Sequence, residues 1–169
     1  MKTFLRLILS GHLIFAAATA ATAQSASISL GTASFDTGQP VEISADALSI
    51  DQGTGQAIFD GNVLVVQGDV RISAGRIVII YAKDAEGNAR GIERLEADGG
   101  VTFVTATDAA EAREAVYFVD NGVVTLSGDV LLTQGPNALA GERLVMDLAA
   151  GTGRMEGRVR TVIGTGDGN

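Results

Sequence analysis

A unit that recurs four times constrains the fold more than any other feature of this sequence. In each copy an apolar residue and one further residue precede Gly-x-Val, and the glycines are Gly61, Gly99, Gly128 and Gly157. A glycine inside a strand usually marks a bulge or a bend. Strand-turn-strand units that bury little alone tend to stack around a shared interior. We therefore expect stacked hairpins whose sheet curves at the same place in each unit.

Apolar and polar residues alternate with a period of two through the same region. Near the C-terminus, Met155, Val159 and Ile163 alternate with charged residues such as Arg158 and Arg160. This period is typical of strands with one buried face, and no long helical pattern follows the N-terminal segment. The predicted fold class is all-β, a folded-over antiparallel sheet with a long internal face. An ordinary β-sandwich, whose hairpins resemble one another through composition alone, is the alternative.

The first 23 residues have the character of a secretory signal peptide. Lys2 and Arg6 precede an apolar run, and small residues lead to the cleavage signal Ala21-Thr22-Ala23. A retained membrane anchor is the alternative, but the apolar run is shorter than the ~20 residues that a spanning helix needs. We expect a cleavable signal peptide at 1–23, a flexible segment at 24–40, a β domain at 41–163 and a polar tail at 164–169.

Cleavage would narrow the chemistry that the chain can carry. It removes His12, the one histidine, and the sequence has no cysteine. Ser-His and Cys-His catalysis, thiolate chemistry and His-based metal sites are then excluded, and we expect no enzyme activity, metal or cofactor. Loss of Lys2 and Arg6 shifts the formal net charge from −8 to −10. So acidic a chain lacks the basic clusters that bind phosphate backbones, which excludes nucleic acid as a partner.

Paired carboxylates leave one catalytic alternative open. Asp46 with Asp51, or Asp60 with Asp69, are candidates for the acid and base of glycosidic cleavage. These residues lie beside Gly and Asn at expected strand ends, where hydrogen bonds from side chain to backbone in turns account for them. The sequence therefore favours a binding or structural protein over a hydrolase.

Two of the repeats share a longer pattern that resembles a known domain. In both, the Gly-x-Val unit is followed by an apolar strand that ends in Gln-Gly, at 61–68 and again at 128–135. Together with 45–51, 72–81 and 92–101, these motifs resemble the OstA-like domain of the LptA family of periplasmic lipopolysaccharide transport proteins. The resemblance covers most of residues 41–159.

The resemblance implies a fold, a ligand and partners. The fold would be a taco-like β-jellyroll in the periplasm, with lipopolysaccharide acyl chains in its interior. Copies would join head to tail by strand addition, through edges near 41–50 and 154–163, into a bridge from an LptC-like inner-membrane component to an LptD-like outer-membrane translocon. An LptC-like component of the same system and a ligand-free structural β-repeat protein are the alternatives.

An apolar trough for acyl chains needs inward side chains without polar atoms, because each buried CH2 contributes ~0.8 kcal/mol. Alternation predicts such a lining, although an inward aliphatic residue in a sheet is more often ordinary core. Phe103, Phe118 and Met146 are favoured for lipid contact, since long or flexible side chains line irregular cavities. The predicted lining residues are Leu48, Ile50, Phe59, Val63, Val65, Ile79, Phe103, Phe118, Leu126, Leu132, Leu144 and Met146.

Arg154, Arg158 and Arg160 form the densest basic group in the chain. They are the candidates for contact with headgroup phosphates at an open end of the trough. The alternative is a solvated strand face that protects a sheet edge from aggregation.

Overall fold

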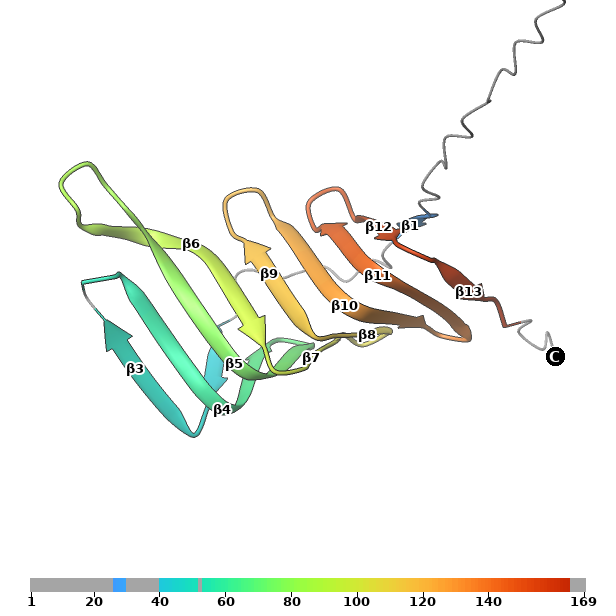
Figure 1. Cartoon of the computed structure of the whole chain (residues 1–169), viewed down its shortest axis with the longest axis horizontal. Helices are drawn as coiled ribbons and strands as arrows, with labels where there is room; N and C mark the ends of the chain where they lie inside the picture. Colours follow the sequence, from blue (N-terminus) through green and yellow to red (C-terminus); the bar gives the residue numbers. More distant parts are fainter. Residues whose placement is uncertain (1–25, 30–39, 52, 165–169) are drawn as a thin grey trace, which may run out of the picture.

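The computed structural model describes residues 26–29, 40–51 and 53–164. Within these ranges thirteen strands form one sheet in which every pairing is antiparallel (Figure 1). The described part of the chain contains no helix of the length and hydropathy that a bilayer span requires. The predicted signal peptide at 1–23 and residues 165–169 of the predicted tail lie outside the described residues.

The strands differ greatly in length, from 3 to 14 residues. They are β1 (Ala26–Ser29), β2 (Glu42–Ser44), β3 (Ala47–Asp51), β4 (Gln56–Gln67), β5 (Val70–Lys83), β6 (Ala89–Asp98), β7 (Val101–Val104), β8 (Asp108–Ala112), β9 (Glu114–Phe118), β10 (Val123–Gln134), β11 (Asn137–Asp147), β12 (Thr152–Glu156) and β13 (Arg160–Val162).

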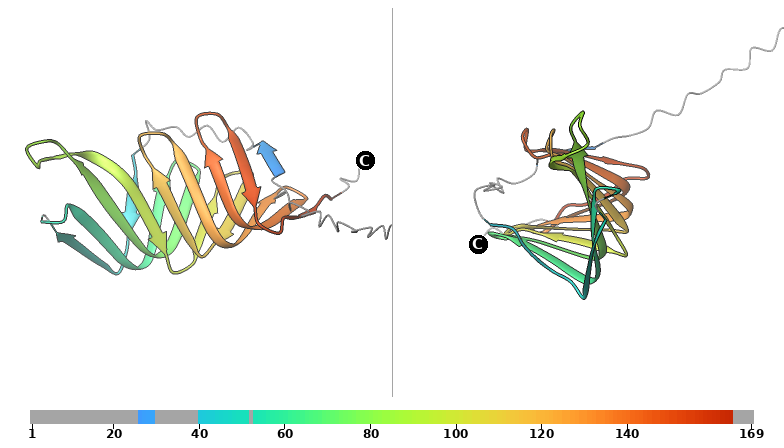
Figure 2. Two further views of the ribbon diagram at one scale, coloured as in Figure 1. Left: turned by 45° about the horizontal axis from the view of Figure 1, so that its top comes forward. Right: turned by 90° about the vertical axis from the view of Figure 1, so that its left-hand side faces the viewer.

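The sheet is folded over into two layers, because β4, β5, β10 and β11 each bend and continue from one layer into the other. Layer A has the strand order β1-β12-β11-β10-β9-β6-β5-β4-β3. Layer B has the order β13-β11-β10-β8-β7-β5-β4-β2. The layers diverge from a common crease, as the right panel of Figure 2 shows along the long axis. The prediction of an all-β, folded-over antiparallel sheet is confirmed.

The recurring glycines lie at this crease and give the chain its bend. In β4, Gly61 and Asn62 have φ values of 79° and 47°, a left-handed backbone that most L-residues avoid. The pairing of β4 with β5 shifts register there, between Asp60 and Val63. Gly99, Gly128 and Gly157 also have positive φ values, of 81°, 83° and 77°. The sequence prediction that each unit bends at its glycine is therefore confirmed.

In three of the four units a polar contact holds the crease from outside, and we call these contacts the crease clips. The residue after the glycine contacts a side chain 16 positions earlier in the chain. Asn62 donates to Asp46 (2.7 Å), and Arg158 forms an ion pair with Glu142 (2.7 Å). Arg113 pairs with Asp129 in the same way. The clips are exposed, so each adds at most about 1 kcal/mol and serves mainly to fix the local geometry.

The inner faces of both layers form the hydrophobic core. The largest fully buried side chains are Leu126, Leu132, Leu144, Met155, Val63 and Val130, which come from β4, β10, β11 and β12. No polar or charged residue is buried among the described residues. Burial of aliphatic surface between the layers is thus the main stabilising term, at about 25 cal/mol per Å².

The ends of the sheet hold the short strands. At one end, β2 is the edge of layer B and β3 the edge of layer A. At the other end, β13 is the edge of layer B, whereas in layer A the N-terminal strand β1 covers β12 (Figure 1). The segment 24–40 was expected to be flexible as a whole, but its residues Ala26–Ser29 form this edge strand.

Two adjacent glycines at the crease give a matched test of what the bend requires. A Cβ added to Gly99 would lie 2.9 Å from the Cα of Gly75, whereas a Cβ on Gly100 meets nothing within 4 Å. Both residues have φ above 80°. We expect Gly100→Ala to cost about 1–2 kcal/mol of unfolding free energy, from backbone strain alone.

Gly99→Ala should cost at least about 1 kcal/mol more than Gly100→Ala, because the added methyl also pushes β5 away from the β6–β7 bend. Urea unfolding of both variants measures the difference. Equal losses for the two variants would contradict the argument that close approach of the backbones sets the crease.

Candidate functional site

Strand register places the inward residues in continuous rows that cross the whole of layer A. One row runs from Leu48 through Phe59 and Ile77 toward Leu126, Leu144 and Met155. A second row begins with Ile50 opposite Ala57 and ends with Met146 opposite Gly153. Layer B faces them with its own inward row, which includes Val65, Ile72 and Phe103. The result is one apolar surface that extends from edge to edge of the domain.

Nine of the predicted lining residues lie on this inner surface and are covered. Seven of them are buried: Val63, Val65, Ile79, Leu126, Leu132, Leu144 and Met146. Phe59 and Phe103 are half-buried against the same core. The middle of the interior is therefore closed by contacts between the side chains of the two layers.

Leu48 and Ile50 lie on the same inner face but are open to solvent. They pair with Phe59 and Ala57 of β4, which fixes the side of the sheet to which they belong. Because β3 has no neighbour on its other side among the described residues, their exposed fractions are 54% and 69%. The apolar surface thus continues to the edge of the domain and is uncovered there.

Phe118 does not face inward as the sequence analysis expected. On β9, Ala115 pairs with the inward residues Leu126 and Ala97, and alternation then places Tyr117 inside and Phe118 outside. Phe118 is 39% exposed. The error arose because the chain crosses the crease at Arg113, and the period of two does not carry through that break. Tyr117 takes the inward position that had been assigned to Phe118.

The three arginines of the basic group do not converge on the interior. Arg154 pairs with Val145 on the outer face of layer A, and Arg160 pairs with Ala140 on the outer face of layer B. Arg158 lies at the crease, in its clip with Glu142. The group therefore spans the outside of one end of the domain, and its contact with a phosphate remains a prediction.

The carboxylates considered for hydrolysis are turn and crease residues in the structure. Asp51 accepts hydrogen bonds from the backbone N–H of Gly53 (2.8 Å) and Thr54 (3.2 Å). These bonds, that from Thr54 above all, hold the pKa of Asp51 below its ordinary value of 3.8. A general acid needs a raised pKa, so Asp51 has the opposite property. Asp46 is in a crease clip, and the described residues contain no group of three His, Cys, Asp or Glu that could hold a metal ion.

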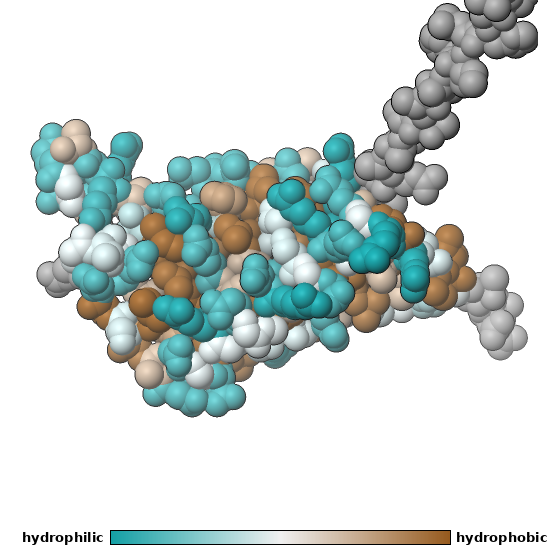
Figure 3. Space-filling view, viewed as in Figure 1, coloured by the Kyte–Doolittle hydropathy of each residue, from teal (hydrophilic) through white to brown (hydrophobic). Residues whose placement is uncertain are grey.

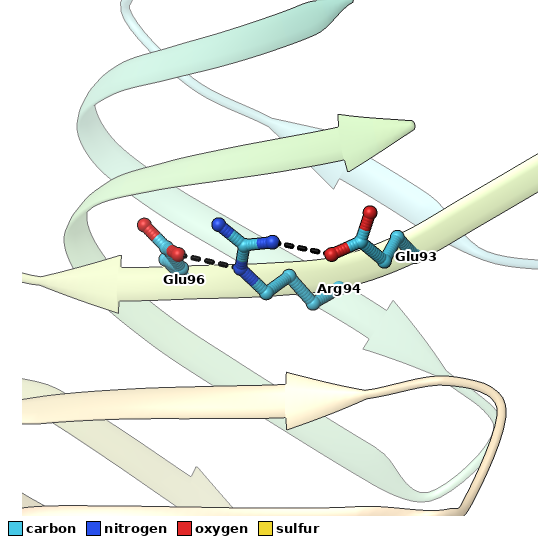
Figure 4. A network of polar contacts seen from close by, with 3 residues as sticks. All are labelled: Glu93, Arg94 and Glu96. Carbon is cyan, nitrogen blue, oxygen red and sulfur yellow. Dashed lines mark hydrogen bonds and ion pairs between the residues drawn. The ribbon is translucent and has the colours of Figure 1, made fainter. Parts of the chain in front are cut away.

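The outer face of layer A carries a charged cluster that sequence reasoning did not identify. Arg94 on β6 lies between Glu93 (2.5 Å) and Glu96 (2.7 Å), as Figure 4 shows. The hydrogen bond to Glu96 is the main cause of a raised pKa for Arg94. Apolar outward residues flank this cluster, including Ile80, which pairs with Arg94, and Val116, which pairs with Glu96. Figure 3 shows such apolar areas mixed with polar ones on the surface.

These features define a class of protein first: a jellyroll-like antiparallel sheet folded over one apolar interior. Comparison with known proteins then gives the family. Residues 42–152 match the family described as LptA/(LptD N-terminal domain) LPS transport protein. This match covers more than half of the chain, so the chain belongs to that family and the predicted resemblance is confirmed.

Individual relatives agree with this assignment. An uncharacterized protein of Rhizobium meliloti is 30% identical over 151 residues, which cover 85% of this chain and 81% of that protein. The lipopolysaccharide export system protein LptA of Escherichia coli K12 is 29% identical over 115 residues, which cover 64% of this chain and 60% of that protein. This chain therefore aligns with less than two thirds of the E. coli protein.

A solved structure shows the same fold. It is the crystal structure of LptH, described as the LptA-homologous periplasmic component of the lipopolysaccharide transport device from Pseudomonas aeruginosa. The TM-score is 0.65 at 22% sequence identity, and the match covers 77% of this chain and 99% of that chain. The jellyroll-like fold expected from the resemblance is confirmed.

The difference between the closed middle and the open edge of the inner face predicts two contrasting substitutions. Leu126→Ala leaves a cavity between the layers and should lower the unfolding free energy by about 2–5 kcal/mol. Ile50→Ala removes a solvated side chain from the same face and should change it by less than about 0.5 kcal/mol. Denaturant unfolding, at a concentration at which the protein is monomeric, measures both changes in unfolding free energy. A large loss for Ile50→Ala would contradict the open edge.

Proposed function

We propose that this protein is a periplasmic component of lipopolysaccharide transport that holds the acyl chains of the lipid against its inner face. The observation that carries the proposal is the unbroken apolar surface between the layers, in a chain of the LptA/(LptD N-terminal domain) family. The names of relatives in Escherichia coli and Pseudomonas aeruginosa, which are a lipopolysaccharide export protein and a periplasmic component, support the compartment and the cargo. The predicted signal peptide supports export.

The energetics favour acyl chains as the part of the lipid that is bound. Each CH2 removed from water contributes about 0.8 kcal/mol, and the inner face is mostly aliphatic and aromatic, with no buried polar or charged residue among the described ones. Since the middle is closed by contacts between the layers, a bound chain replaces those contacts, and the uncovered Leu48 and Ile50 provide a place where it can begin to insert. Anionic headgroups add little binding free energy, because the protein is itself acidic and interactions between charges more than ~8 Å apart are screened at physiological salt.

The proposal includes a bridge between the two membranes, built from copies joined head to tail. Counted without β1, each layer has eight antiparallel strands, so a second copy placed at either end continues the antiparallel pattern in both layers. The joint would bring β2 and β3 of one copy to β13 and β12 of the next. An LptC-like inner-membrane component and an LptD-like outer-membrane translocon would take the terminal positions.

A ligand-free structural role is the second candidate, and the closed middle of the interior is the observation that favours it. In that role the side chains of the two layers contact only one another. Lipid contact at inward positions distinguishes the two functions directly.

Photo-crosslinking in the cell tests the lipid-binding proposal with two pairs of neighbours. Phe103 faces the core and Thr102 the outside of β7, and Tyr117 and Phe118 form the same contrast on β9. A photoreactive residue at Phe103 or Tyr117 should give an adduct with lipopolysaccharide, detected by blotting, and one at Thr102 or Phe118 should not. Adducts at none of the four sites in folded protein would favour the ligand-free role.

The head-to-tail joint is tested on β3 with a matched outer-face control. Ile50→Asp places a charge on inner surface that the joint would bury, and it should weaken self-association at least about tenfold in sedimentation experiments. Ser49→Asp puts the same charge on the outer face of the same strand and should have a much smaller effect. Equal effects of the two substitutions would show that the joint does not continue the inner face.

A further inference from the structure

We propose that β1 is an intramolecular substitute for β3 of a second copy, and that the two strands compete for the free edge of β12. The inference rests on the proposed head-to-tail joint, and it adds that the chain's own N-terminal strand regulates the formation of that joint. In this arrangement the N-terminal strand closes the joining edge of layer A, and a second copy opens it by displacing that strand.

The position and direction of β1 are those that β3 of a second copy would have. Without β1, β12 is the last strand of layer A, and β1 pairs with it antiparallel over residues 152–155. Strand directions alternate across the layer, so an added β3 would also lie antiparallel to β12. The two strands therefore need the same backbone hydrogen-bonding groups and exclude each other.

The two strands also match in sequence when they are aligned by register. Ala26-Ser27-Ile28-Ser29 of β1 corresponds to Leu48-Ser49-Ile50-Asp51 of β3. In backbone register Ile28 is opposite Gly153 and Ile50 is opposite Ala57, so each isoleucine position faces the position of a small residue in the neighbouring strand. Ala26 and Leu48 lie opposite the larger Met155 and Phe59. A strand of the β3 pattern therefore fits the β12 edge that β1 occupies.

Layer B shows what the same end of the domain looks like without such a cover. The outer edge of β13 has no neighbouring strand among the described residues. Val162 of β13 and the following Ile163 are 66% and 77% exposed, and Figure 3 shows an apolar area at this end of the domain. A seam between β13 and β2 can form while β1 stays in place, but a seam between β12 and β3 cannot. Joining then proceeds in two steps, with layer B first and the release of β1 second.

The stability of the two arrangements favours exchange. β1 offers four residues to β12, and its attachment to the same chain gives it an effective concentration in the millimolar range. β3 of a second copy offers five residues, buries the exposed Leu48 and Ile50 and acts together with the β13–β2 seam. A second copy that has already docked through layer B can thus displace β1, whereas one that meets only the covered edge cannot.

A disulfide between β1 and β12 tests the exchange. Ser27 and Arg154 are directly opposite, at a separation that a disulfide spans, and the chain has no cysteine of its own. The full chain with Ser27→Cys and Arg154→Cys is compared in its oxidised and reduced forms by sedimentation velocity over a range of concentrations. Oxidation should weaken self-association at least about tenfold, to the level of Ile50→Asp, and reduction should restore it.

Deletion of residues 26–29 gives the opposite expected change. Self-association should become about tenfold or more tighter, because the competing strand is gone. Thermal unfolding checks that the deletion variant is folded. If it is not, the comparison of the oxidised with the reduced disulfide variant alone decides whether the exchange takes place. If oxidation leaves self-association unchanged, the exchange is overturned and the proposed joint stays intact. If the oxidised, reduced and deletion forms are all monomeric at every concentration, the joint itself is overturned.

Discussion

The bend of four long strands through one crease is the constraint on which the rest of this structure depends. If a sheet of this width stayed open, both of its faces, including the apolar one, would be exposed to solvent. By bending β4, β5, β10 and β11 at the crease, where β4 and β10 have a left-handed backbone, the chain covers the apolar face with its own other half. The core, the exposed edges and the apolar interior are all consequences of that fold.

Much of this architecture was predictable because its cause is local. A glycine at a fixed place in each repeat has a clear physical meaning, and Gly61, Gly99, Gly128 and Gly157 all lie at the crease. Alternation likewise placed residues such as Val63 and Leu144 on the inner face, where both are buried, because the period of two holds on each side of the crease. The predicted inward positions therefore agree with the structure within the strand segments that lie between bends.

The features that escaped prediction depend on contacts between distant residues or on breaks in the strand pattern. Phe118 was placed inside because nothing in the sequence marks the change of layer at Arg113, whose backbone N–H donates to the carbonyl groups of Ser127 and Gly128. The crease clips join residues of unrelated types, Asn with Asp in one and Arg with Glu in another. Their constant separation of 16 residues was the one available signal. β1 was missed because its four residues, with Ile28 as the one large apolar side chain, are too few for alternation to be distinguished from chance.

The number of strands in each layer has a consequence for growth of an assembly. With β1 in place, layer A has an odd number of strands and layer B an even number. Strand direction alternates, so a further copy added by simple translation would have to pair parallel in one layer and antiparallel in the other. A chain with β1 seated is thus a natural terminus, whereas a chain with β1 released has matching parity in both layers. One short strand, by changing the number of strands in layer A from even to odd, can in this way set where a polar, non-closing array stops.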